Sequence, residues 1–179
     1  MTNETKQKIL DAALKLFAEK GYNSATIRDI TTEAGVNDST LFRKFKTKEN
    51  LFSSVLIQNY QKMKEDFDSI IVHNEFEDQA DFLETFIRNL MNLGKNNFDF
   101  IKLTVDESNR IPINFLEDFI NNLSEYLEKN IQSKEINYKI FVFNALSFIY
   151  FLLLDYGHVF KDHDKAIEKF INNSTLCIK

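Results

Sequence analysis

Residues 26–45 read TIRDITTEAGVNDSTLFRKF and carry the signals for two short helices joined by a tight turn. Thr26 is followed three residues later by Asp29, which is the spacing of a capping box, in which each side chain binds the other residue's backbone N–H. Gly35 comes nine residues after this cap, where a left-handed backbone can end a helix without a steric penalty. The pattern predicts a first helix over 27–34.

The second helix is predicted to start directly after the turn. Asn37 is a favourable N-cap residue, and Val36 and Leu41 have the spacing of a hydrophobic staple. Leu41, Phe42 and Phe45 are expected to form its apolar stripe. The helix therefore covers 38–45, and the pair of helices has the arrangement of a helix-turn-helix unit.

One helix on each side is expected to brace this unit. Residues 5–20 place apolar side chains at spacings of three and four, and Gly21 follows in the position of a left-handed C-terminal cap. Thr47 is expected to cap a longer helix, with apolar positions from Leu51 to Ile70.

The rest of the chain is expected to form a helical bundle, because the 179 residues contain only four Gly and one Pro, too few for a turn-rich β protein. The fold class is therefore all-α, with an N-terminal three-helix domain expected at 1–47 and a C-terminal helical domain at 48–179. The expected helices of the second domain are one capped by Asp78 and closed by Gly94, one near 98–103, one starting at Pro112, one from Ser133 or Lys134 to Gly157, and one over about 163–177.

The most apolar segment, residues 140–154, is too short for a membrane span. It has fifteen residues and is interrupted by Asn144 and Ser147, whereas a bilayer requires about 20. It predicts a helix buried on most of its circumference, against a second subunit as well as its own. The polar residues 1–6 predict no signal peptide, and the single cysteine, Cys177, allows no intramolecular disulfide.

The charge is distributed unevenly along the chain. The formal net charge is −5, but residues 1–50 hold nine Lys/Arg and seven Asp/Glu, a net of +2, which leaves −7 for the remainder. A polyanion is therefore expected to dock on the amino-terminal fifty residues.

The outward face of the second short helix has the chemistry to contact DNA. With Leu41 and Phe45 buried, the opposite face carries two hydroxyls and two cations, from Ser39, Thr40, Arg43 and Lys44. Such groups suit phosphates and base edges in the major groove. Further phosphate-directed groups are expected at Thr26, Lys46 and Lys48.

Residues 9–52 resemble the DNA-binding domain of the TetR/AcrR family of bacterial transcriptional regulators. The matching stretches, in order, are 9–13, 16–17, 21–22, 26–30, 34–36, 40–42, 45–46 and 48–52. Two positions depart from the common pattern: many members have glycine where this chain has Ser39, and tyrosine where it has Phe42. Phenylalanine cannot donate the phosphate hydrogen bond of that tyrosine. Asp38, often a basic or small residue in the family, must avoid phosphates or accept from a cytosine amino group.

The resemblance implies a cytoplasmic, homodimeric repressor that pairs through its last two helices and binds a pseudo-palindromic operator in double-stranded DNA. A small apolar or aromatic effector in the C-terminal domain would release it. The residues expected at the DNA are Thr26, Arg28, Asn37, Ser39, Thr40, Phe42, Arg43, Lys44, Lys46 and Lys48. The residues expected at the ligand are Phe86, Asn144, Ser147 and Tyr150, although each of these is equally interpretable as part of the packed bundle.

Other classes of function remain as alternatives. A helical small-molecule or lipid carrier without DNA binding would have the same composition, and an activator has the same sequence features as a repressor. An enzyme is not expected, because no Ser/His/Asp grouping stands out and Cys177 has no evident base partner. No cofactor or metal is expected, since His73, His158 and His163 lack converging ligands.

Overall fold

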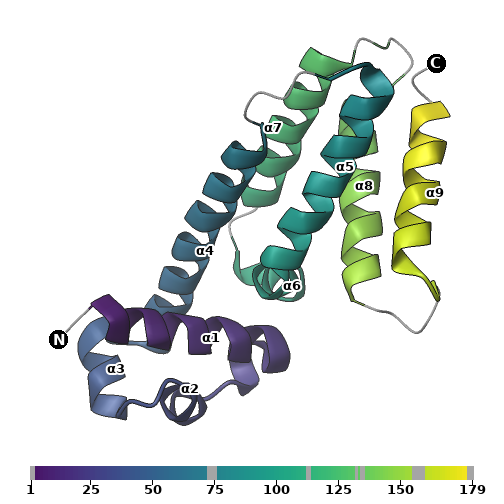
Figure 1. The fold of residues 1–179 in the computed structure, drawn as a ribbon. Helices are drawn as coiled ribbons and strands as arrows, with labels where there is room; N and C mark the ends of the chain where they lie inside the picture. The colour runs from purple at the N-terminus through teal and green to yellow at the C-terminus, as the bar shows by residue number, and fades with distance from the viewer. Residues whose placement is uncertain are drawn as a thin grey trace. The chain divides into compact units, whose positions relative to one another are not determined.

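The computed structural model describes residues 3–71, 76–111, 114–131, 133, 136–154 and 160–176, and within them the chain is helical with no strand. The helices, shown in Figure 1, are α1 Asn3–Ser24, α2 Ile27–Glu33, α3 Asp38–Phe45, α4 Lys48–Ile71, α5 Gln79–Asn96, α6 Phe98–Asp106, the 3-10 turn η1 Ser108–Arg110, α7 Asn114–Asn130, α8 Tyr138–Leu153 and α9 His163–Leu176. The all-α prediction is confirmed.

The chain packs as two compact units. The first comprises Met1–Asp68 together with Asn97–Pro112, and the second Ser69–Asn96 with Ile113–Lys179. Helix α6 and η1 thus pack with the helix-turn-helix, although they lie far along the chain. The predicted domains 1–47 and 48–179 are divided by function and not by packing, and this division stays a prediction.

The first unit has one continuous core. Side chains from α1, α2, α3, α4 and α6 contribute, and the fully buried members include Ile9, Phe17, Ile30, Leu41 and Leu103. Burying one such side chain is worth roughly 1.5–3 kcal/mol, so this core fixes the position of the two short helices.

Gly21 ends the first, long part of α1 as expected, and a short second helical segment follows it within the range of α1. The Gly21 φ of 78° and ψ of 159° are non-helical, and one more turn follows, in which the Ala25 N–H donates to the Gly21 carbonyl oxygen. The conformation is open to glycine and costly for other residues. The chain therefore kinks at Gly21 and continues helically to Ser24, and Tyr22, directly after the kink, is buried at 7% exposure.

The second unit is built on α5, α7, α8 and α9. Helix α5 is capped by Asp78, whose Oδ1 accepts from the N–H groups of Ala80 and Asp81, as expected. Gly94, however, does not close α5, because the helix continues to Asn96. Its role is close packing: a Cβ at Gly94 would lie 3.0 Å from Leu153 Cδ1 and 3.1 Å from Ile149 Cγ2 of α8.

The very apolar helix α8 differs from its prediction at its start, while its predicted burial against a second subunit stays a prediction. It starts at Tyr138, with the side chain of Asn137 accepting from the Ile140 N–H as the N-cap, not at Ser133 or Lys134. Within the single chain it buries one side, through Val142, Ala145, Ile149 and Leu152, while its opposite side is exposed. None of the helices in the described ranges has the length and apolar character needed to span a membrane.

Candidate nucleic-acid interface

The predicted capping box is present at the start of α2. Thr26 Oγ1 accepts from the Asp29 N–H at 3.1 Å, and the Asp29 carboxylate accepts from the Thr26 N–H at 3.3 Å. Hydrogen bonds to the Asp29 carboxylate, from the backbone of Thr26 and to a smaller extent from its side chain, hold the pKa of that carboxyl below its usual range. The capping box therefore fixes the start of α2, the first helix of the helix-turn-helix.

The turn between α2 and α3 is closed by glycine and by backbone bonds. Gly35 has a φ of 65°, and the Val36 N–H donates to the Thr31 carbonyl oxygen at 2.9 Å. Asn37 occupies the N-cap of α3, but its side chain makes no capping hydrogen bond, contrary to the prediction. The start of α3 is instead tied to α2 by Asp38, whose Oδ1 accepts from the buried hydroxyl of Thr31.

Helix α3 presents a continuous exposed stripe. Leu41 and Phe45 turn inward and are 0% and 4% exposed. The exposed residues at spacings of three and four are Ser39, Phe42, Arg43 and Lys46. Thr40 and Lys44 are half-buried at the edges of this stripe. Five of these six residues lie within α3, and Lys46 is its C-cap. Phe42, expected in the apolar stripe, is exposed instead.

Three other predicted DNA-contact residues, which lie before α3 in the sequence, are also exposed. Thr26 and Arg28 lie at the start of α2, and Asn37 lies directly before α3. The Thr26 hydroxyl already accepts from the Asp29 N–H in the capping box. Lys46 is the C-cap of α3, with a positive φ of 69°.

Lys48 is placed differently from the other predicted cations. Its Nζ lies 4.5 Å from the centroid of the Tyr22 ring and 3.4 Å from the Asn23 carbonyl oxygen. Burial lowers the pKa of the Lys48 ammonium. This ammonium therefore braces the end of α1 against the start of α4, in addition to any role toward a phosphate.

Sequence reasoning missed a cluster of residues from α6 and η1 that holds the same end of α1. Glu107 Oε1 accepts from the Tyr22 N–H at 2.7 Å, and Arg110 donates to Asn23 Oδ1 at 3.0 Å and to Glu107 Oε2 at 3.1 Å. Lys102 Nζ donates to the Ala18 carbonyl oxygen. No local pattern could have indicated the contacts with α1, because they join residues more than eighty positions apart.

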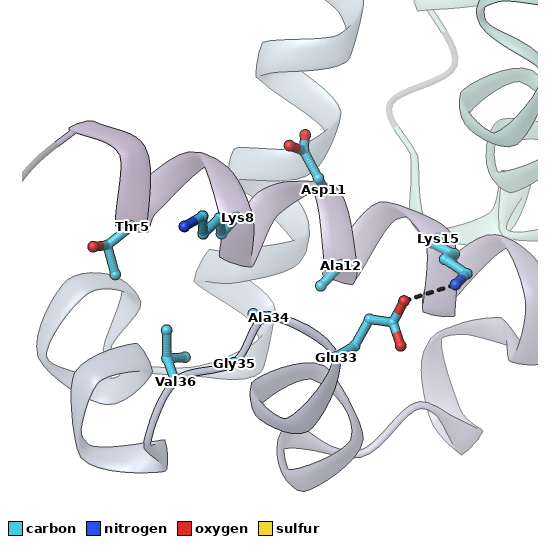
Figure 2. Close-up of a pocket in the computed structure, with 9 residues that line it drawn as sticks. All are labelled: Thr5, Lys8, Asp11, Ala12, Lys15, Glu33, Ala34, Gly35 and Val36. Atoms are coloured by element: carbon cyan, nitrogen blue, oxygen red, sulfur yellow. Dashed lines mark hydrogen bonds and ion pairs between the residues drawn. The ribbon is translucent and has the colours of Figure 1, made fainter.

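An open cleft lies between α1 and the α2–α3 turn (Figure 2). It has a volume of about 650 Å³ and is lined by Thr5, Lys8, Asp11, Ala12, Lys15, Glu33, Ala34, Gly35 and Val36. Lys15 Nζ and Glu33 Oε1 form a 2.7 Å ion pair across it. None of the lining residues is one of the predicted DNA contacts, and the exposed pair contributes little to stability.

The predicted ligand residues lie on α5 and α8 of the second unit and differ in burial. Phe86 of α5 is buried and stacks on the Tyr126 ring of α7 at 6.1 Å, and burial raises the pKa of the Tyr126 phenol. On α8, Ser147 and Tyr150 are half-buried, whereas Asn144 is exposed. Asn144 therefore lies on the outer side of α8, away from its buried residues.

The described side chains contain no group of three or more His, Cys, Asp or Glu placed to hold a metal ion. The residues considered in this connection, His73, His158 and Cys177, and the predicted helix boundaries at Pro112 and Gly157, lie outside the described residues.

Residues 9–55 match the family described as bacterial regulatory proteins, tetR family. The chain is 46% identical over 44 residues to the HTH-type transcriptional regulator YvkB of Bacillus subtilis (strain 168), a segment that makes up 25% of this chain and 23% of YvkB. The chain thus spans about a quarter of the length of this relative, and the likeness concerns the helix-turn-helix region.

Two solved structures share the fold across nearly the whole chain. AibR, in complex with isovaleryl coenzyme A and operator DNA, has a TM-score of 0.75 and 12% identity, with 93% of this chain and 96% of AibR covered. FadR from Bacillus subtilis, in complex with stearoyl-CoA, has a TM-score of 0.66 and 18% identity, with 97% of each chain covered. The family match is confined to residues 9–55, and the likeness to these two structures shows that the rest of the chain shares their fold.

Proposed function

We propose that this protein is a DNA-binding transcriptional repressor that acts in the cytoplasm as a homodimer on a pseudo-palindromic operator. The observation that carries the proposal is the exposed stripe of α3, where Ser39 and Arg43 stand outward while Leu41 and Phe45 anchor the helix in the core. A recognition helix needs this combination, because its outer side chains must reach base edges from a fixed support. A structure in which Ser39 and Arg43 were buried beneath the helical bundle would have contradicted this proposal.

The proposed dimer uses the exposed apolar side of α8. Ile140, Phe143 and Phe151 are 59%, 56% and 60% exposed within one chain and share one helix face. Large apolar residues grouped on a surface favour association. A second copy would cover them through the last two helices, and the two α3 helices would then address half-sites about 34–36 Å apart.

The proposed effector is an apolar or aromatic small molecule bound by the second unit. That unit carries a row of aromatic rings, with Phe82 5.0 Å from Phe76 and 5.6 Å from Tyr126, and such surfaces suit apolar ligands. Because FadR and AibR were solved with acyl-coenzyme A molecules, acyl-CoA thioesters are the first to test. The effector must favour a form that binds DNA less well.

DNA binding is tested by fluorescence anisotropy of duplexes from the region upstream of the chain's own gene, titrated with salt. A regulator gives saturable binding whose log affinity falls by about 0.9 per contacted phosphate for each decade of salt. The double variant Arg43→Ala/Lys44→Ala should lose most of this binding, while the control Lys129→Ala on α7 should keep it. A carrier without DNA binding would give no salt-dependent complex.

Assembly and release are measured separately. Phe143→Glu with Phe151→Glu should convert a dimer into monomers in sedimentation velocity and weaken operator binding, while Leu116→Glu, also exposed but on α7, should leave the dimer intact. Addition of stearoyl-CoA should dissociate the DNA complex, and free coenzyme A should not. A reporter gene that rises when the protein is deleted identifies a repressor, and one that falls identifies an activator.

A further inference from the structure

Phe42 is an apolar residue in the middle of an otherwise polar stripe. It follows Ser39 by one turn, precedes Lys46 by one turn and is adjacent to Arg43. Its side chain is 45% exposed, whereas the neighbouring Leu41 is 0% exposed. Leu41 is therefore buried in the core of the first unit, whereas a large part of Phe42 lies on the surface that is proposed to contact DNA.

The fate of this exposed surface in a complex follows from the chemistry of the groove. If α3 enters the major groove, a ring at the centre of its outer stripe is removed from water. Packing it against a phosphate would desolvate a charge without replacing the lost hydrogen bonds. Among the base edges of the major groove, the C5-methyl group of thymine is the apolar group.

We propose that Phe42 is a specificity-determining residue that packs on a pyrimidine C5-methyl group, that of a thymine, in each operator half-site. The inference rests on the proposed function, since it requires α3 to enter the major groove. It assigns Phe42 a part in sequence readout, in place of the phosphate hydrogen bond that a phenylalanine cannot donate. The contact is apolar, so it is independent of salt and selects thymine over cytosine.

The test is a double-mutant cycle between the side chain and the methyl group. An operator duplex is first selected from a random library with the full chain, and each thymidine is then replaced singly by deoxyuridine, which removes the methyl group and keeps the pairing. For the wild type, one position per half-site should lose affinity by about fourfold, the value of one buried methyl-sized group. In Phe42→Ala the same replacement should change the affinity by less than about 1.5-fold, a residual below the ~0.3–0.5 kcal/mol within which independent changes add.

Matched variants separate this contact from other roles of α3. Phe42→Tyr keeps the ring and should keep the methyl dependence. Lys44→Ala should weaken binding of all duplexes and leave the fourfold methyl effect intact. Because Phe42 is half-exposed, circular dichroism melting should show that Phe42→Ala remains folded. Replacing the identified thymine by cytosine and then by 5-methylcytosine should show affinity lost and partly regained, which traces the effect to the methyl group.

The outcomes distinguish this inference from the proposed function. Salt-dependent binding without any methyl-sensitive position, or a methyl effect that persists in Phe42→Ala, overturns the role of Phe42 and leaves the DNA-binding function standing. Such a result would place the ring on deoxyribose, where contacts are independent of sequence. Absence of a salt-dependent complex with any duplex overturns both.

Discussion

Glu107 at the end of α6 accepts a 2.7 Å hydrogen bond from the backbone N–H of Tyr22, just after the bend in α1. The same carboxylate is held by Arg110 through its second oxygen. The bond satisfies an N–H group of a core residue, so α6 and α1 of the first unit are joined by a polar contact as well as by packing. This arrangement makes Glu107 a structural residue of the helix-turn-helix unit.

Glu107→Ala should destabilise the first unit. The variant leaves the Tyr22 N–H without its charged acceptor, a loss of about 1.5–3 kcal/mol. Urea denaturation should show a lower midpoint with an unchanged slope. Glu128→Ala, on the exposed surface of α7, provides the control and should match the wild type. Equal midpoints for both variants would show that water replaces the carboxylate without cost.

The capping box predicts an acid-sensitive contribution to stability. The pKa of Asp29 is lowered in the folded protein, so its contribution is fully present above the unfolded pKa of about 4 and is lost as the pH falls through the lower folded value. Asp29→Asn should therefore flatten the dependence of unfolding free energy on pH in this acidic window. Thermal melts between pH 2 and 6 measure it, and Asp11→Asn, exposed on α1, serves as the comparison. Identical pH profiles for wild type and Asp29→Asn would contradict the contribution.

Gly94 should tolerate no large side chain, because α8 lies against it. Gly94→Val places new atoms where Leu153 and Ile149 already stand and should cost roughly 1–3 kcal/mol. In a Leu153→Ala background the same substitution should cost less, since the nearest obstructing methyl group is gone. Urea denaturation of the wild type, the two single variants and the double variant measures the cost of Gly94→Val in each background. Equal costs in both backgrounds would mean that the backbone shifts to admit the side chain.

Arg43 and Lys48 should differ in how their loss affects DNA binding. If Arg43 contacts a guanine in bidentate fashion, Arg43→Ala should cost about 1–3 kcal/mol on the best operator and relax selectivity at one base. Lys48→Ala should weaken all duplexes alike and flatten the salt dependence. Because Lys48 lies over Tyr22, its variant should also lose about 0.5–1 kcal/mol of stability. Unchanged affinity for either variant removes that residue from the proposed interface.

The helix-turn-helix was predictable because its signals are local. The capping box at Thr26, the positive φ at Gly35 and the alternation of Leu41 and Phe45 with exposed residues each depend on neighbours within a few positions. Asn37 occupies the N-cap of α3 as predicted, but its side chain makes no capping hydrogen bond. The hydroxyl of Thr31, on the preceding helix, holds Asp38 and fixes the start of α3 without it.

The sequence by itself determined the all-α class and the two short helices, because helix periodicity and capping act within single turns. Tertiary structure decided which distant segments meet. It placed α6 with the first unit through Glu107 and turned Gly94 from a helix end into a packing contact with α8. Such choices depend on shape and on hydrogen-bonding partners supplied by other helices, and these exist only once the chain has folded.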